Sequence, residues 1–241
     1  MPAALITGGT TGIGRANAAL LHARGHRGAV TGQSAEPLAR ARRELSDDMI
    51  VVRSDVRVPP KPRLSWQGCP NVSGLSTCCS ATTPGFLPRT GRAGVAEKSF
   101  DEHVDVNFKG RHTLQKARPQ TNDGGPIILT VDSASRRGSP GATVGAGLRG
   151  AVLAMLPSLA LELAPRRIRV NTVSNGATET PLFDKLGEPQ NGRDAIRTKI
   201  PFERSGSSQE AAEAVAFPAS DITGYATGQD FAVAGGYEPG A

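Results

Sequence analysis

The chain has 241 residues, a length at which α/β folds are commonly undivided, so we expect a single domain covering residues 1–241. The formal net charge of +6 does not indicate a nucleic-acid partner, because one stretch, residues 57–95, holds five basic and no acidic side chains. No apolar run approaches the roughly 18 residues of a membrane span, and no early segment resembles a signal peptide. We therefore expect a cytoplasmic protein with no nucleic-acid or membrane partner.

The apolar stretch Ala3–Thr7 predicts a strand, and a glycine-rich turn separates it from an amphipathic helix over Ile13–Arg24. Strands and helices then alternate along most of the chain. We expect further strands at 28–31, 49–53, 126–131, 167–173 and 230–234, and further helices at 37–45, 97–117, 142–164 and 208–220. Such alternation is typical of the α/β class, in which helices cover both faces of a doubly wound parallel sheet.

The turn after the first strand, Thr7–Gly14, has the composition of a diphosphate-binding loop. Gly8 permits a tight turn, Gly12 lets the backbone approach a phosphate, and Gly14 lets the helix pack closely on the strand. The helix then presents unpaired N–H groups and the positive end of its dipole to the anion. The residues expected to contact a dinucleotide here are Thr7, Gly8, Thr11, Gly12, Ile13 and Gly14.

The spacing Thr-Gly-x-x-x-Gly-x-Gly in this turn resembles that of the short-chain dehydrogenase/reductase family. Val104–Gly110 is similar to the family's helix with an active-site Asn, and Ile168–Pro181 is similar to the strand and loop at the nicotinamide end. The likeness covers residues 3–56 and 97–237. It implies a Rossmann-like fold, an NAD(P)-dependent oxidoreductase that acts on a small-molecule carbonyl or secondary alcohol, and a homo-oligomer, either a tetramer or a dimer.

The resemblance also assigns residues to the two ends of the cofactor. Asp55 stands where the family has an acid that contacts adenine, and Thr180 lies in the loop at the nicotinamide end. Gln33 ends the second strand, where no acid is available for the adenosine 2′-hydroxyl, so NADP is favoured and NAD is the alternative. No arginine occupies this position for the 2′-phosphate; Arg15 and Arg40 are candidates, or they are solvated side chains on helix faces.

The catalytic positions depart from the family's pattern. The family uses a Tyr as proton donor, a Lys four residues later and a Ser about 13 residues before the Tyr. The corresponding positions hold Gly145 and Arg149, with Asp132 or Ser133 at the Ser position, whereas Asn107 is kept. The candidate catalytic residues are thus Asn107, Ser133 and Arg149, and no histidine or cysteine spacing indicates a metal site.

Because glycine has no proton to donate, we expect a degenerate family member with impaired activity. The alternatives are a non-catalytic dinucleotide-binding relative and an inactive product of a damaged reading frame. The helix that should hold the catalytic positions also contains Gly147, Gly150 and Pro157, and Pro218 lies in the last expected helix. These residues cost roughly 1 kcal/mol per glycine and about 3 kcal/mol per interior proline, so both helices are expected to be weakened.

Residues 57–95 do not match the family and show no regular pattern. One permitted choice of codons for Ser76–Phe86, read from the third base, encodes Asp-Val-Leu-Phe-Cys-Asn-Asn-Ala-Gly-Val, which is similar to the family's missing strand and cofactor loop. We therefore hypothesise that this segment is translated out of frame and is poorly ordered. Codons in the gene that cannot give that second translation would refute the hypothesis.

Overall fold

The computed structural model describes residues 2–55, 57, 75–80, 95–109, 121–136, 142–182 and 190–237. For residues 75–80, 134 and 190–192 it describes the backbone alone.

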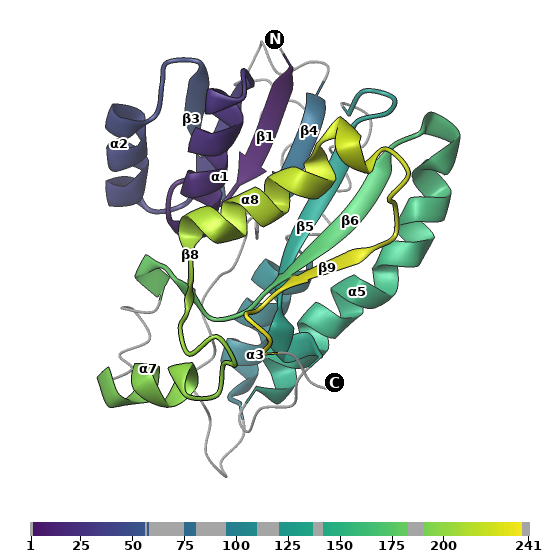
Figure 1. Cartoon of the computed structure of the whole chain (residues 1–241). Helices are drawn as coiled ribbons and strands as arrows, with labels where there is room; N and C mark the ends of the chain where they lie inside the picture. Colours follow the sequence, from purple (N-terminus) through teal and green to yellow (C-terminus); the bar gives the residue numbers. More distant parts are fainter. Residues whose placement is uncertain are drawn as a thin grey trace.

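Within these residues, a 7-stranded parallel sheet has the strand order β3-β2-β1-β4-β5-β6-β9 (Figure 1). Its strands are β1 (Ala3–Thr7), β2 (Arg27–Gly32), β3 (Met49–Arg53), β4 (Leu75–Ser80), β5 (Pro126–Asp132), β6 (Arg169–Asn175) and β9 (Asp230–Val233). A separate parallel pair joins β7 (Thr178–Glu179) to β8 (Gly206–Ser207). The chain builds outward from β1 to β3 and then returns to the other side of β1. In such sheets, ligands bind beyond the carboxyl ends of the strands, at the point where the order reverses.

Helices cover both faces of this sheet, which confirms the predicted doubly wound α/β fold (Figure 1). The α-helices are α1 (Gly12–Ala23), α2 (Ala35–Glu44), α3 (Glu97–Val104), α5 (Thr143–Leu163), α7 (Gln190–Arg197) and α8 (Ser208–Ala219). One π-helical turn, η1 (Asp105–Lys109), continues α3. Short 3₁₀ turns are η3 (Ser133–Ser135), η4 (Ala164–Arg166) and η5 (Asp221–Thr223).

Alternating side chains of the central strands form two separate cores. On β1, Leu5 packs in the cluster that contains α5, whereas Ala4 and Ile6 pack in the cluster that contains α1 and α8. All three are buried, because both faces of a parallel sheet are covered by helices. The two clusters hold the carboxyl end of β1, and with it the glycine-rich turn, in a fixed position.

Strand β4 is the main difference from the expected elements, because the sequence predicts no strand in residues 57–95. Its backbone pairs in parallel with β1 on one side, where Thr77 lies opposite Ala4, and with β5 on the other, where Cys78 lies opposite Ile127. Without β4, buried N–H and C=O groups of β1 and β5 would lack partners, and that pairing outweighs the weak side-chain pattern. The hypothesis of an alternative frame, which would encode Asp-Val-Leu-Phe with one permitted choice of codons, stays a prediction. The rest of 57–95, except Arg57 and Val95, lies outside the described residues.

Helix α5 is continuous, although the sequence predicts that glycines and a proline weaken it. Pro157 lies within the helix on its exposed side. The opposite side is anchored to the sheet by buried residues, namely Val152, Leu156, Leu159 and Leu163. Packing of this apolar face offsets the local cost of the proline. Pro218 is likewise accommodated, in the last turn of α8.

One helical stretch, Thr143–Arg166, is long and apolar enough to cross a membrane by length and composition, with a mean hydropathy of 1.6 over an 18-residue window. The expectation that nothing approaches a membrane span was therefore too strict. The stretch consists of α5 and η4, and 28% of the window is buried inside the protein. Its buried leucines belong to the core beside β5 and β6, which accounts for part of its hydrophobicity. The absence of a membrane partner stays a prediction.

Candidate functional site

The glycine-rich turn follows β1 at the point where the strand order reverses. Thr7 ends the strand and is buried. Gly8 and Gly12 have φ angles of 67° and 51°, in the left-handed region that strongly favours glycine. A Cβ atom on Gly12 would also lie 3.1 Å from Cγ2 of Thr180. The chain thus brings the side chain of Thr180, from the loop after β6, close to the backbone of Gly12.

The N-terminus of α1 provides backbone donors at this turn. The N–H of Arg15 donates to the carbonyl of Thr11 at 3.1 Å. Among the described residues, the N–H groups of Gly12, Ile13 and Gly14 have no hydrogen-bond acceptor, and Thr11 gives no side-chain cap. No acidic residue lies in the first turn of the helix. These donors and the helix dipole fit the diphosphate of a dinucleotide.

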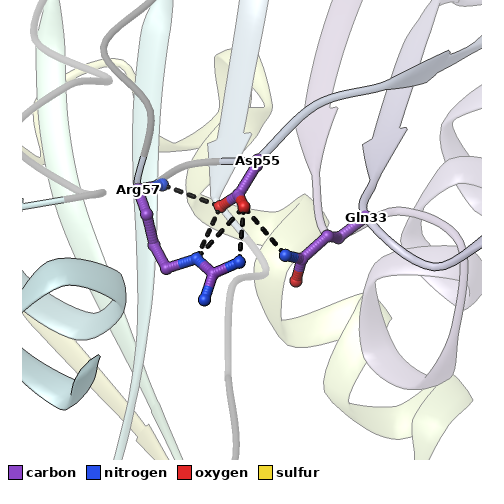
Figure 2. A network of polar contacts seen from close by, with 3 residues as sticks. All are labelled: Gln33, Asp55 and Arg57. Carbon is purple, nitrogen blue, oxygen red and sulfur yellow. Dashed lines mark hydrogen bonds and ion pairs between the residues drawn. The ribbon is translucent and has the colours of Figure 1, made fainter. Parts of the chain in front are cut away.

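Beyond β2 and β3, Gln33 and Asp55, the two residues that the resemblance assigns to the adenosine end, lie together (Figure 2). Nε2 of Gln33 donates to Oδ2 of Asp55 at 2.8 Å. Arg57, which the sequence analysis did not assign to the site, binds the same carboxylate: its Nη2 lies 2.6 Å from Oδ2 and its Nε 2.9 Å from Oδ1. The hydrogen bonds from Arg57 lower the pKa of Asp55 below its usual value. The only sequence signal for Arg57 was its place two residues after Asp55.

The two arginines considered for the 2′-phosphate have acidic partners. Arg15 forms an ion pair with Glu44, at the end of α2. Arg40 lies 3.7 Å from Glu36, one turn earlier on the same helix. Each positive charge is therefore partly neutralised by a carboxylate of α2, and neither arginine joins the cluster at Asp55.

Two expected catalytic residues lie at the carboxyl edge of the sheet beside α5. Asn107 sits in the π-helical turn η1 and is only 2% exposed. Its Oδ1 atom is buried without a hydrogen-bond partner among the described residues. Such turns inside helices occur frequently at functional sites. Ser133 directly follows β5 and is also buried. Both η1 and η3 pack against α5, so the structure places these residues around one helix.

Arg149 occupies the space beside Gly145, the residue that the resemblance assigns to the family's tyrosine position. The side chain of Arg149 is only 4% exposed, and its Nε lies 2.6 Å from Oδ2 of Asp132. A Cβ atom built on Gly145 would lie 2.7 Å from Nη1 of Arg149. The guanidinium thus fills the volume that a larger side chain at 145 would enter, and Asp132 holds it there. Tyr225 is fully exposed in the segment before β9 and is not part of this cluster.

The described residues contain no group of three or more His, Cys, Asp or Glu side chains that could hold a metal ion. The candidate site instead has two parts: backbone donors and the Gln33–Asp55–Arg57 cluster on one side of the order reversal, and the ion pair of the buried Arg149 with Asp132 on the other. Asp132 was one of two candidates for the serine position, and the structure shows that it pairs with Arg149, whereas Ser133 lies next to it.

The chain is similar to known proteins over almost its whole length. A family described as enoyl-(acyl carrier protein) reductase matches residues 8–238. The chain belongs to the short-chain dehydrogenase/reductase family of oxidoreductases. It is 32% identical over 235 residues to a 3-oxoacyl-[acyl-carrier-protein] reductase of Rickettsia felis, covering 96% of this chain and 95% of the relative. It is also 32% identical over 243 residues to nodulation protein G of a Rhizobium species, with 97% and 95% covered.

Solved structures show the same fold over nearly the whole chain. A short-chain dehydrogenase/reductase from Brucella melitensis, described as a glucose/ribitol dehydrogenase, has a TM-score of 0.89 at 26% identity and covers 99% of this chain and 97% of its own. A short-chain dehydrogenase/reductase from Serratia marcescens has a TM-score of 0.88 at 25% identity, with 98% and 97% covered.

Proposed function

We propose that this protein binds a nicotinamide dinucleotide and has retained little of the carbonyl reduction that the family performs. The observation that supports this most directly is the replacement of the acid: Gly145 has no proton to donate, and the adjacent space is filled by Arg149, paired with Asp132. The glycine-rich turn, in contrast, keeps the backbone geometry that a diphosphate needs. Binding and catalysis have therefore been affected unequally.

A bound cofactor would supply the hydride, and the remaining steps depend on residues of this chain. The Ser133 hydroxyl is the group that could donate a hydrogen bond to a substrate carbonyl, and the Asn107 amide oxygen could hold a water molecule nearby. Arg149 cannot act as the general acid, because a guanidinium keeps its proton at neutral pH. The proton would have to come from solvent, and loss of a positioned acid costs roughly 10²–10⁴-fold in rate.

The relatives suggest the class of substrate. Several are named 3-oxoacyl-[acyl-carrier-protein] reductases, so we propose a 3-oxoacyl thioester or a similar small carbonyl compound, with the corresponding secondary alcohol as product. The absence of an acid at Gln33 favours NADP over NAD. By family resemblance we also propose a cytoplasmic homo-oligomer. The exposed apolar residues of α5, such as Leu161 at 77% exposure, are consistent with a helix that packs against another copy.

Titration of the purified protein with NADPH, followed by nicotinamide fluorescence, tests the binding half of this proposal. We expect saturable enhancement, with weaker affinity than in relatives that keep the Asn-Asn-Ala-Gly loop. Submicromolar affinity would contradict the proposed loss of that loop. Complete absence of enhancement would instead favour the alternative of an inactive product of a damaged reading frame. Binding without turnover of any carbonyl compound would favour the non-catalytic relative.

A further inference from the structure

The carboxylate of Asp55 has no capacity left for another donor. Oδ1 accepts from the backbone N–H of Arg57 at 3.0 Å and from its Nε at 2.9 Å. Oδ2 accepts from Nη2 and Nε of Arg57 at 2.6 and 3.1 Å, and from Nε2 of Gln33 at 2.8 Å. A carboxylate has about four lone-pair directions, and these contacts fill them. Figure 2 shows the carboxylate enclosed between the two side chains.

Arg57, in contrast, has donor capacity to spare. Among the described residues its Nη1 has no hydrogen-bond partner, and Figure 2 shows that nitrogen pointing away from Asp55. The side chain of Arg57 is 40% exposed, so a ligand can reach it. The hydrogen bonds to Asp55, with smaller contributions from the charges of Glu102 and Asp105, raise the pKa of Arg57 above its usual value.

The cluster lies where the base of a bound dinucleotide would be read. Gln33 follows β2 and Asp55 follows β3. These two strands are neighbours, and both lie on the side of β1 that is opposite to β4. With the diphosphate at the N-terminus of α1, the adenosine half of a dinucleotide extends over these two strands. This placement rests on the proposed function.

We propose that Arg57 reverses the hydrogen-bonding preference of the base subsite, so that it favours a base with a 6-oxo group over adenine. The 6-amino group of adenine is a donor and would meet either a filled carboxylate or another donor, the Arg57 guanidinium. A 6-oxo group, as in hypoxanthine or guanine, is an acceptor and can take the remaining N–H of Arg57. A hydrogen bond from the 6-amino group of adenine to Asp55 requires displacement of Arg57 or Gln33, whereas a hydrogen bond from Arg57 to a 6-oxo group does not.

The test compares reduced nicotinamide hypoxanthine dinucleotide with NADH, by nicotinamide fluorescence at one ionic strength. We expect the wild-type protein to bind the hypoxanthine compound about tenfold more tightly, a typical effect of one hydrogen bond to a charged group. The variant Arg57→Ala frees the carboxylate of Asp55, so NADH should become the tighter ligand. Arg27→Ala is the matched control, because Arg27 is also exposed and begins β2 at the opposite edge of the sheet.

Three results would overturn the inference while leaving the proposed function intact. One is tighter binding of NADH by the wild type with no change of the ratio in Arg57→Ala. Another is that both dinucleotides bind equally more weakly to that variant, which would indicate that the base stacks on the guanidinium. The third is a loss of affinity in Arg57→Ala that is confined to NADPH, which would place Arg57 at the 2′-phosphate. Failure of every dinucleotide to bind to the wild type and both variants would overturn the proposed function as well.

Discussion

Two buried polar side chains show how differently single residues are accommodated in this fold. Arg169, at the start of β6, donates to the carbonyls of Pro218, Ser220 and Thr223 and so satisfies the end of α8. Asn17, on α1, is completely buried, but neither its Nδ2 nor its Oδ1 has a hydrogen-bond partner among the described residues. Burial of an unpaired polar group costs free energy, whereas a fully paired one is tolerated.

Replacement of Asn17 by leucine should therefore raise the free energy of unfolding by about 1–3 kcal/mol, the cost of the unpaired amide. The two side chains are similar in size, and Ala18 and Leu21, on the same helix, belong to a buried apolar cluster. Urea denaturation followed by circular dichroism measures the change. Asn17→Ala is the control, because it removes the amide but leaves a cavity, so its gain should be smaller. A loss of stability in Asn17→Leu would show that the amide has a partner.

At the scale of elements, some helices are stabilised by hydrogen bonds within their own sequence and others by packing against neighbouring elements. The α8 helix begins with a capping box, in which the backbone N–H of Glu210 donates to the side chain of Ser207 at 3.1 Å, and the backbone N–H of Ser207 donates to Glu210 at 2.8 Å. Arg204 donates two hydrogen bonds to the same carboxylate, one to each oxygen. Helix α5 begins without a side-chain cap and depends on packing against the sheet.

The carboxylate of the capping box makes the free energy of unfolding depend on pH. Hydrogen bonds from Arg204 and Ser207 lower the pKa of Glu210 from 4.5 to about 2. Because the folded-state pKa is depressed, the stabilising contribution is fully present above pH 4.5 and is lost as the pH falls towards 2. Glu210→Gln should therefore flatten the dependence of unfolding free energy on pH across this window, as measured by urea denaturation at several pH values. An unchanged slope would show that the carboxylate does not contribute.

Helix α5 should be easy to stabilise, because Pro157 removes a backbone hydrogen bond on its exposed side. Pro157→Ala is expected to raise the free energy of unfolding by up to about 3 kcal/mol. A Cβ on Gly147 would meet no atom within 4 Å, so Gly147→Ala should add about 1 kcal/mol. Thermal denaturation of each variant checks both values. Destabilisation by Pro157→Ala would mean that a bend at the proline is needed for packing.

At the scale of the whole molecule, the sequence predicted what depends on local pattern. The turn from Gly8 to Gly14 was recognised because its glycine spacing is set by its own backbone. Strand β4 was missed, because pairing with β1 and β5 fixes it rather than any alternation of its residues. The Asp132–Arg149 pair and the contact of Arg57 with Asp55 were missed for a related reason: each depends on contacts that only the folded chain creates.

We propose that Gly145 and Arg149 together leave the site without a proton donor, and the double variant Gly145→Tyr/Arg149→Lys tests this most directly. Gly145→Tyr alone should stay inert, since its Cβ would lie 2.7 Å from the Arg149 guanidinium, and Arg149→Lys alone should stay inert because it still lacks an acid. NADPH oxidation with a panel of 3-oxoacyl thioesters and small ketones should be nearly undetectable in the wild type and in both single variants. In the double variant it should rise by roughly 10²–10⁴-fold. Ordinary turnover by the wild type, or a double variant that binds NADPH and remains inert, would contradict the account.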